Sequence, residues 1–200
     1  MSARAVDGRT ARRERNRQEV VEAALTLVDE GEADPSIEQL TKRSGLSARS
    51  IFRYFDGLDD LRREVMRRHF DRVEPLGEIP DPGQGRFDQR VKSFVETRIR
   101  LNEAMAGQAR TARLRAPYSS VIANDIREYR GVLDAQVRKH FAPELKGRSR
   151  AEADDLVTVV DVLMSFDGWD LLVSEHSRSR PQVRRAWTQA LTNLFGRGTP

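Results

Sequence analysis

Residues 36–61 read SIEQLTKRSGLSARSIFRYFDGLDDL, and this stretch decides the fold. Two short helical patterns lie on either side of a Ser-Gly-Leu turn. Ser36 precedes the first pattern, and Gln39 lies three positions after Ser36. These two residues can therefore form a capping box that satisfies the first free amide groups of a helix. The spacing predicts a helix from about residue 37 to residue 44.

The turn and the second pattern predict a helix-turn-helix. Gly45 supplies the backbone freedom that a tight interhelical turn needs, and Ser47 can cap a helix over residues 48–55. Ile51 and Phe55 are four residues apart and share the apolar face. The polar side chains that point elsewhere suit a DNA groove: Arg49, Ser50 and Arg53. The same pattern also fits a small helical core with solvated arginines on its surface.

These residues resemble the reading head of the TetR family of bacterial transcriptional repressors, of the TetR/AcrR helix-turn-helix type. In that family the head has a hydroxyl-capped helix, a glycine-containing turn and a recognition helix with an aromatic end. The matching parts here are Ser36, Ser44-Gly45-Leu46-Ser47 and Ile51-Phe52-Arg53-Tyr54-Phe55. The resemblance covers roughly residues 10–70. It implies an all-α fold, a double-stranded DNA operator as partner, and repression that a small molecule relieves.

Three positions depart from the family pattern. Phe52 stands where the family has a tyrosine, and Leu58 stands where it has a lysine; both family residues contact phosphates. Arg49 replaces a small residue and can reach a guanine edge or a phosphate. We expect DNA contacts from Ser36, Lys42, Arg43, Ser47, Arg49, Ser50, Arg53 and Tyr54.

The distribution of charge supports DNA binding more than the net charge of +4 does. Residues 1–17 are rich in arginine, residues 42–53 carry bases without acids, and every charge between residues 18 and 40 is negative. Two basic patches fit phosphate tracking and insertion of the N-terminal arm into the minor groove. The alternative for the arm is a solubilising tail.

Helical periodicity predicts an N-terminal helix-turn-helix domain of three helices and a larger helical body. We expect a basic arm over residues 1–15, the DNA-binding domain over 16–57, and a ligand-binding and dimerisation domain over 58–200. A helix begins near Leu58, and the proline- and glycine-rich stretch of residues 75–85 predicts a loop. Four helical blocks without a strand follow, with a break at Gly107 and capping boxes at Ser149 and Ser179.

The last two helical patterns are unusually apolar and predict a homodimer. Two short recognition helices read more DNA than one when a twofold axis places them about 34 Å apart. In the resembled family these two helices form the dimer's four-helix bundle. Our interface candidates are Leu163, Trp187, Leu191, Leu194 and Phe195. The alternative is that these residues form an ordinary monomer core.

The resemblance implies a ligand cavity in the body, and an unknown small molecule as its occupant. Bulky side chains and one arginine are candidates for its lining. They are Phe94, Met105, Arg113, Tyr118, Tyr129, Phe166 and Trp169, with His69 and Asp161 as further polar groups. A core or surface role is the alternative for each of them. A helix-turn-helix protein that responds to a protein partner, or to no inducer, fits the same sequence.

Nothing in the sequence favours an enzyme, so we expect no catalytic residue, no metal and no cofactor. The three histidines, His69, His140 and His176, lack metal-ligand spacing, and no phosphate-binding or dinucleotide-binding glycine motif occurs. A hydrolytic cluster of Glu175, His176 and Asp170 lacks a nucleophile. With no cysteine and no long apolar run, we expect a cytoplasmic protein without disulfides or a membrane span.

Overall fold

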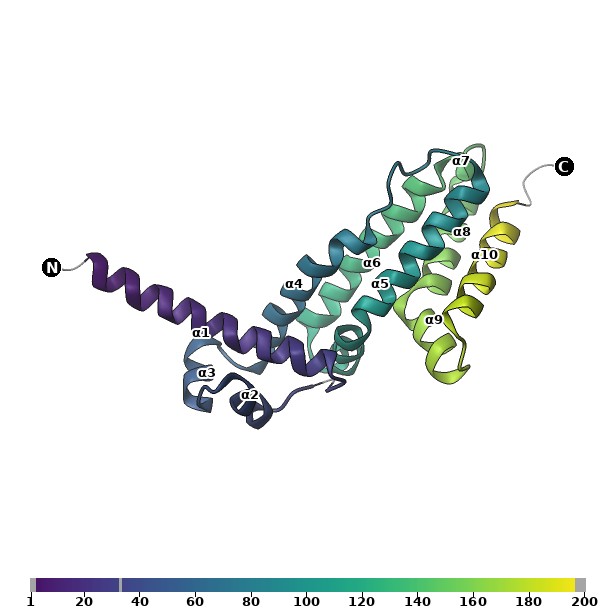
Figure 1. Cartoon of the computed structure of the whole chain (residues 1–200). Helices are drawn as coiled ribbons and strands as arrows, with labels where there is room; N and C mark the ends of the chain where they lie inside the picture. Colours follow the sequence, from purple (N-terminus) through teal and green to yellow (C-terminus); the bar gives the residue numbers. More distant parts are fainter. Residues whose placement is uncertain (1–2, 33, 197–200) are drawn as a thin grey trace. The chain divides into compact units, whose positions relative to one another are not determined.

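The computed structural model describes residues 3–32 and 34–196, which form helices and no strand (Figure 1). The α-helices are α1 (Ala3–Asp29), α2 (Ile37–Ser44), α3 (Ala48–Tyr54), α4 (Leu58–Gly77), α5 (Phe87–Arg115), α6 (Ser120–His140), α7 (Ala142–Leu145), α8 (Arg150–Met164), α9 (Phe166–Asp170) and α10 (Arg180–Gly196). A 3-10 turn spans Ala116–Tyr118, and a π-helical turn spans Leu171–Glu175. The all-α class predicted from the sequence is confirmed.

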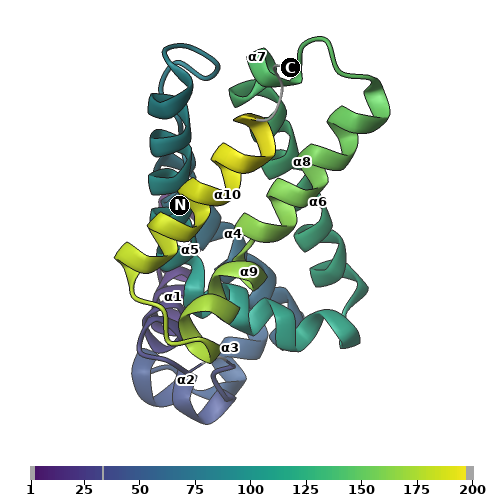
Figure 2. The ribbon, with the colours of Figure 1, turned by 90° about the vertical axis from the view of Figure 1, so that its right-hand side faces the viewer.

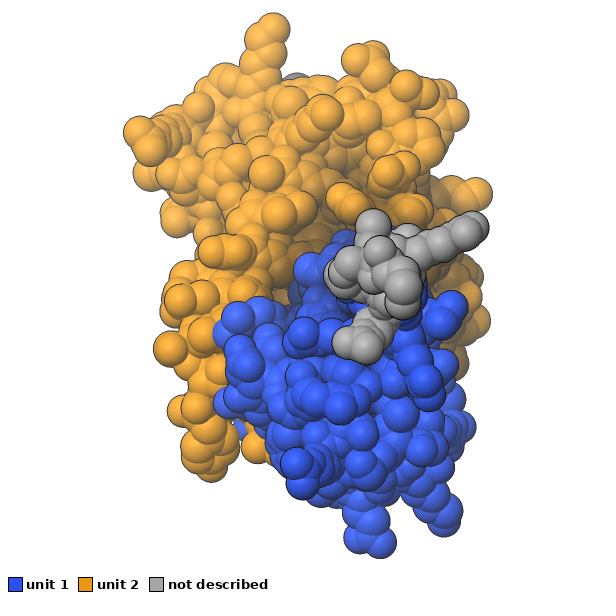
Figure 3. Space-filling model, turned by 90° about the vertical axis from the view of Figure 1, so that its left-hand side faces the viewer, with its two compact units in different colours: residues 1–72, 107–114 blue, residues 73–106, 115–200 orange. Residues whose placement is uncertain are grey.

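The chain divides into two compact units (Figure 3). The first, here called the head, comprises Met1–Arg72 and Gly107–Leu114; the second, the body, comprises Val73–Ala106 and Arg115–Pro200. The long helices α4 and α5 therefore each contribute residues to both units. No helix among the described residues is both long and apolar enough to cross a membrane.

The head is built around one apolar core beneath the helix-turn-helix. Side chains from α1, α2, α3 and α4 meet there, and each fully buried aliphatic or aromatic group contributes about 1.5–3 kcal/mol. The core includes Val20, Val21, Leu25, Leu40, Ile51, Phe55 and Leu61. As the four-residue spacing predicted, Ile51 and Phe55 are both buried.

The helix caps predicted at Ser36, Ser47 and Ser149 are present, whereas at Ser179 only the amide and hydroxyl contacts to Gln182 Oε1 form. The backbone amide of Gln39 donates to Ser36 Oγ (3.2 Å), and the amide of Ser36 donates to Gln39 Oε1 (2.7 Å). Gly45 ends α2 with a left-handed backbone (φ 71°), which glycine adopts without strain. Ser47 caps α3 by accepting from the amide of Ser50 at 3.2 Å. The capping box at Ser149 also forms, at the start of α8.

The observed helices differ from the expected ones at two places before α5. The stretch predicted as a separate basic arm is helical from Ala3 and continuous with the first helix. Residues 11–15 of this stretch are alanine, arginine and glutamate, and all three are good helix formers. Helix α4 continues through Pro75 to Gly77, so the loop begins one turn later than expected.

Gly107 marks close packing instead of a helix break, because α5 runs through it without interruption. A Cβ atom added at Gly107 would lie 2.8 Å from the carbonyl oxygen of Val28, near the end of α1. Glycine therefore lets two segments of the head approach closely.

The body packs α8 against α6 and α10 (Figure 2). Aromatic rings form part of its core: those of Phe141 and Phe195 stack with centroids 4.5 Å apart, and Phe94 meets Phe141 edge-on at 5.1 Å. The buried aliphatic members include Val91, Val137, Val160, Met164, Val183 and Leu191.

This core corrects the dimer residues chosen from the sequence. Trp187 is 3% exposed, and Leu191 and Phe195 are also buried within a single chain. Their periodicity identified a buried face, but the body itself covers that face. Leu194 is partly buried, and Leu163 is exposed at 40%. Leu163 shares the surface of α8 with two further exposed apolar residues, Val159 and Val162.

Candidate nucleic-acid interface

The exposed face of α3 carries two arginines and one aromatic ring. Arg49, Phe52 and Arg53 are exposed, whereas Ile51 and Tyr54 are buried on the opposite side. The exposed residues lie three and four positions apart, so they share one helix face. Phe52 is 52% exposed, a large fraction for an apolar ring on a short helix. An apolar group flanked by two guanidinium groups can meet both thymine methyl groups and guanine or phosphate acceptors.

Arg49 and Lys42 are the expected DNA-contacting cations without a partner among the described residues. Both are exposed, on α3 and α2 respectively. The three serines expected to contact DNA serve the helix starts: Ser36 and Ser47 are N-caps, and Ser50 Oγ lies 3.0 Å from Ser47 Oγ.

Arg53 and Tyr54 are tied to each other and to α1. Arg53 Nη2 donates to the Tyr54 hydroxyl at 2.9 Å, and Asn16 Nδ2 donates to the same oxygen at 2.9 Å. The hydrogen bonds from Asn16 and then Arg53 lower the pKa of Tyr54, to which the charge of Arg12 also contributes. The buried phenol thus anchors Arg53 at the exposed edge of α3.

Arg43 is engaged within the head. Its Nη1 donates to Glu30 Oε1 at 2.9 Å, and its Nη2 donates to the other oxygen of the same carboxylate. This paired geometry raises the pKa of Arg43 through the hydrogen bond to Glu30. Arg43 can contact a DNA phosphate only if the phosphate replaces the Glu30 carboxylate.

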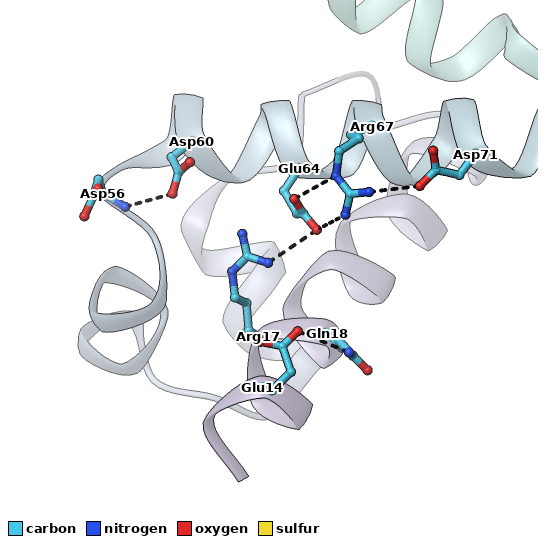
Figure 4. Close-up of polar contacts among 8 residues, drawn as sticks. All are labelled: Glu14, Arg17, Gln18, Asp56, Asp60, Glu64, Arg67 and Asp71. Atoms are coloured by element: carbon cyan, nitrogen blue, oxygen red, sulfur yellow. Dashed lines mark hydrogen bonds and ion pairs between the residues drawn. The ribbon is translucent and has the colours of Figure 1, made fainter. Parts of the chain in front are cut away.

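A second group of charges was not identified from the sequence (Figure 4). Arg17 of α1 covers the ring of Phe55 at 4.9 Å from the centroid, and its Nη1 lies 3.3 Å from Glu64 Oε1 of α4. Glu64 also accepts from Arg67 at 2.7 Å, and Arg67 reaches Asp71 at 3.0 Å. The hydrogen bond from Arg67 holds the pKa of Glu64 below its usual value, although burial has the opposite effect. The charge of Arg17 lowers this pKa further.

Only part of that network has a sequence signal. The Arg67 pairs follow the three- and four-residue spacing of helical ion pairs. The contact between Arg17 and Glu64 depends on how α1 and α4 pack, which no local pattern reports.

Among the side chains that the structure describes, the N-terminal part of α1 exposes Arg12, Arg13 and Arg15. Figure 1 shows this part of α1 extending beyond α2 and α3. A helix with side chains is about 10–12 Å wide, whereas the minor groove of B-DNA is about 6 Å wide. The helical arm therefore cannot enter the minor groove as the sequence analysis expected. The arginine side chains of this segment can still contact DNA phosphates. Residues 1 and 2 lie outside the described residues.

The side chains proposed for a ligand pocket do not form one cluster. Arg113 belongs to the head and the other six to the body. Tyr118 is 85% exposed. Of the remaining residues, Phe94 and Tyr129 both lie near Arg98, and the Tyr129 hydroxyl donates to Met105 Sδ at 3.1 Å. The rings of Phe166 and Trp169 contact each other, with centroids 5.8 Å apart.

The histidines are dispersed as well. His140 is buried in the body and bonds the Arg90 carbonyl, whereas His176 is exposed and His69 is buried in the head. Within residues 3–32 and 34–196, no group of three or more metal-ligating side chains is arranged to hold an ion.

The sequence matches no model of a protein family, and no curated protein matches it. Solved structures do match. A transcriptional regulator from Rhodococcus sp. Rha1 is 18% identical, with a TM-score of 0.64 over 92% of this chain and 96% of that one. A transcriptional regulator of the TetR/AcrR family from Aquifex aeolicus VF5 is 15% identical, with a TM-score of 0.58 over 90% and 99%.

A protein from Pseudomonas aeruginosa PAO1 is 16% identical, with a TM-score of 0.66 over 92% of each chain. The likeness extends over both the head and the body, and it is a likeness of structure at low sequence identity. The chain therefore has the all-helical fold of these solved transcriptional regulators, one of which is a TetR/AcrR family protein.

Proposed function

We propose that the protein is a sequence-specific DNA-binding transcriptional regulator whose recognition helix is α3. The observation that carries this proposal is the exposed face formed by Arg49, Phe52 and Arg53 on a short, capped helix. The opposite face is held in the core of the head by Ile51 and Phe55. The fold shared with solved transcriptional regulators supports the same function.

The contacts within the head assign different roles to its basic residues. Arg49 is free to form a paired contact with a guanine edge. Lys42, and Arg12, Arg13 and Arg15 of α1, provide positive charge for phosphates. Arg53 is already ordered by Tyr54, so DNA binding costs it less rotamer entropy than a free arginine. Ser36 and Ser47 contribute through the helix starts, whose amide groups favour anions.

The regulator acts as a homodimer that binds a twofold operator in the cytoplasm. A small molecule that binds the body releases the operator by favouring a form of the dimer with displaced recognition helices. Such a ligand acts only through different affinities for the two forms. The apolar surface of α8 supports the dimer, because exposed valines and a leucine gain from burial against a second copy.

Fluorescence anisotropy with fragments that tile the DNA upstream of the coding sequence tests the DNA-binding function. We expect one fragment to bind far more tightly than the others, with a preference that survives an increase from about 50 to 200 mM salt. Equal binding to all fragments that disappears with salt would show a head without sequence readout. The matched control is an Arg49→Ala and Lys42→Ala double variant, which removes the unpaired cations of α2 and α3 and should bind the preferred fragment more weakly.

A further inference from the structure

Two arginines are buried among the described residues of the body, and Arg98 is buried more deeply than Arg90. Arg98 lies on α5 and is 2% exposed. Its Nη2 donates to the Leu133 carbonyl oxygen of α6 at 3.0 Å, and its guanidinium carbon lies 4.8 Å from the centroid of the Phe94 ring. Neither contact brings a negative charge to the guanidinium.

The guanidinium has an unfilled donor. Its Nε is buried and has no hydrogen-bond partner, and Arg98 forms no ion pair with any described residue. Burial lowers the pKa of Arg98 to about 10, so the group is still charged at neutral pH. A buried cation without a close counter-charge destabilises a protein, and so does a buried donor without an acceptor.

Two polar groups lie near enough to interact with this charge. Asp161 of α8 can act on Arg98 with a negative charge, and the phenol of Tyr129 on α6 also lies within electrostatic reach of the guanidinium. Burial raises the pKa of Tyr129 to about 12, which keeps its phenol protonated as a donor, and burial also raises the pKa of Asp161. Because Asp161 forms no ion pair with Arg98, it is a distant counter-charge that a better-placed anion can replace.

An aromatic ring and a thioether also lie beside these polar groups. The Phe94 ring covers the guanidinium, and the Met105 thioether accepts the Tyr129 hydroxyl. A guanidinium beside a phenol recognises a carboxylate, and an aromatic ring with a thioether accommodates an apolar body.

We propose that Arg98 binds the carboxylate of a small organic acid with an aromatic or aliphatic body, taking over from Asp161 as the counter-charge of the guanidinium. The unfilled Nε of a nine-tenths buried cation, covered by the Phe94 ring, carries this assignment. It names the ligand class of the regulator proposed above, and it requires no contact with DNA.

Thermal unfolding of the full chain with benzoate, phenylacetate and octanoate at millimolar concentration tests the site, with the corresponding neutral amides as controls. We expect at least one acid to raise the unfolding midpoint by about 2–4 °C, and its amide to leave the midpoint unchanged. Absence of a shift with all three acids would overturn the proposal.

Arg98→Met should abolish the acid-dependent shift and raise the midpoint without acid, because it removes an uncompensated buried charge. Arg100→Met is the matched control on the same helix. Its guanidinium is exposed and donates to the Leu76 carbonyl at 2.9 Å, so the response to acids should persist. An acid response that survives in Arg98→Met would place binding elsewhere and refute the site.

Asp161→Asn keeps the test decisive if Arg98→Met does not fold. Loss of the competing carboxylate should lower the acid concentration needed for half of the shift several-fold; an unchanged concentration would contradict the proposed exchange.

The DNA assay separates the two proposals. A chain that binds one fragment specifically but ignores the acids loses only the Arg98 site, and a chain that responds to acids without binding DNA loses only the regulatory function.

Discussion

At the scale of single residues, the head divides its basic side chains into engaged and available groups. Arg17, Arg43, Arg62, Arg67 and Arg72 each pair with a carboxylate of the head. Lys42 and Arg49, with Arg12, Arg13 and Arg15 of α1, have no such partner in the described part of the chain. Because exposed ion pairs contribute little to stability, the pairs chiefly determine which guanidinium groups remain free for DNA.

Arg49→Ala and Lys42→Ala should affect DNA binding differently. We expect Arg49→Ala to cost about 1–3 kcal/mol on the preferred fragment and to relax selectivity at one base pair. Lys42→Ala should weaken binding on every fragment alike and lower the salt slope by about 1. Anisotropy titrations on the preferred fragment and its single-base variants distinguish them. A uniform loss in Arg49→Ala would assign that side chain to a phosphate.

His140 should make the stability of the body depend on pH. It is 1% exposed, its Nε2 lies 2.9 Å from the Arg90 carbonyl, and its Nδ1 has no partner. Burial lowers the pKa of His140, and the charge of Arg90 also lowers it. The hydrogen bond to the Arg90 carbonyl and the charge of Glu144 have the opposite effect. The unfolded chain therefore takes up the proton first, and stability falls as the pH drops below about 6.5.

Thermal unfolding between pH 7.5 and 5 should show this loss. His140→Gln keeps a donor for the Arg90 carbonyl but removes the titration, so its midpoint should change less over that range. His176→Gln, on the surface, controls for the removal of a histidine as such. If His140→Gln and the unmodified chain lost stability in parallel, another group would be responsible.

At the scale of helices, local signals could be predicted from the sequence and packing could not. The caps at Ser36, Ser47 and Ser149 depend on residues within three positions, and all three are present. The break expected at Gly107 is absent, because the reason for that glycine is the backbone of Val28, far away in the sequence. The exposed face of α3 was predicted from spacing, whereas the engagement of Arg43 by Glu30 depends on how α1 packs on α2.

Gly107→Ala should destabilise the head although alanine favours helix. Its Cβ would lie 2.8 Å from the Val28 carbonyl oxygen, and such overpacking costs about 1–3 kcal/mol. Gly131→Ala on α6 is the matched control, since nothing lies within 4 Å of the added atom. It should stabilise the chain by about 0.5–1 kcal/mol. Urea unfolding measures the stability of both variants. A gain in stability for Gly107→Ala would show that the backbone at Val28 shifts at little cost.

At the scale of the whole molecule, the proposed function calls for two copies of the chain, and burial indicates which surface can join them. Periodicity grouped Trp187, Leu191 and Phe195 with Leu163 because all lie on apolar stripes, but a stripe does not reveal what covers it. The structure covers the first three within one chain and leaves Val159, Val162 and Leu163 exposed on α8. These three lie at positions i, i+3 and i+4, so they form one face.

Val162→Asp should therefore disrupt the dimer without unfolding the chain. Val162 is 60% exposed, so a carboxylate there is solvated in the monomer but would be buried without a partner in a dimer. Sedimentation velocity should show monomers, circular dichroism should keep its helical signal, and affinity for a twofold operator should fall because each recognition helix binds alone. Trp187→Glu should instead unfold the body, because that side chain is 3% exposed. A folded Trp187→Glu monomer beside a dimeric Val162→Asp would move the interface back to α10.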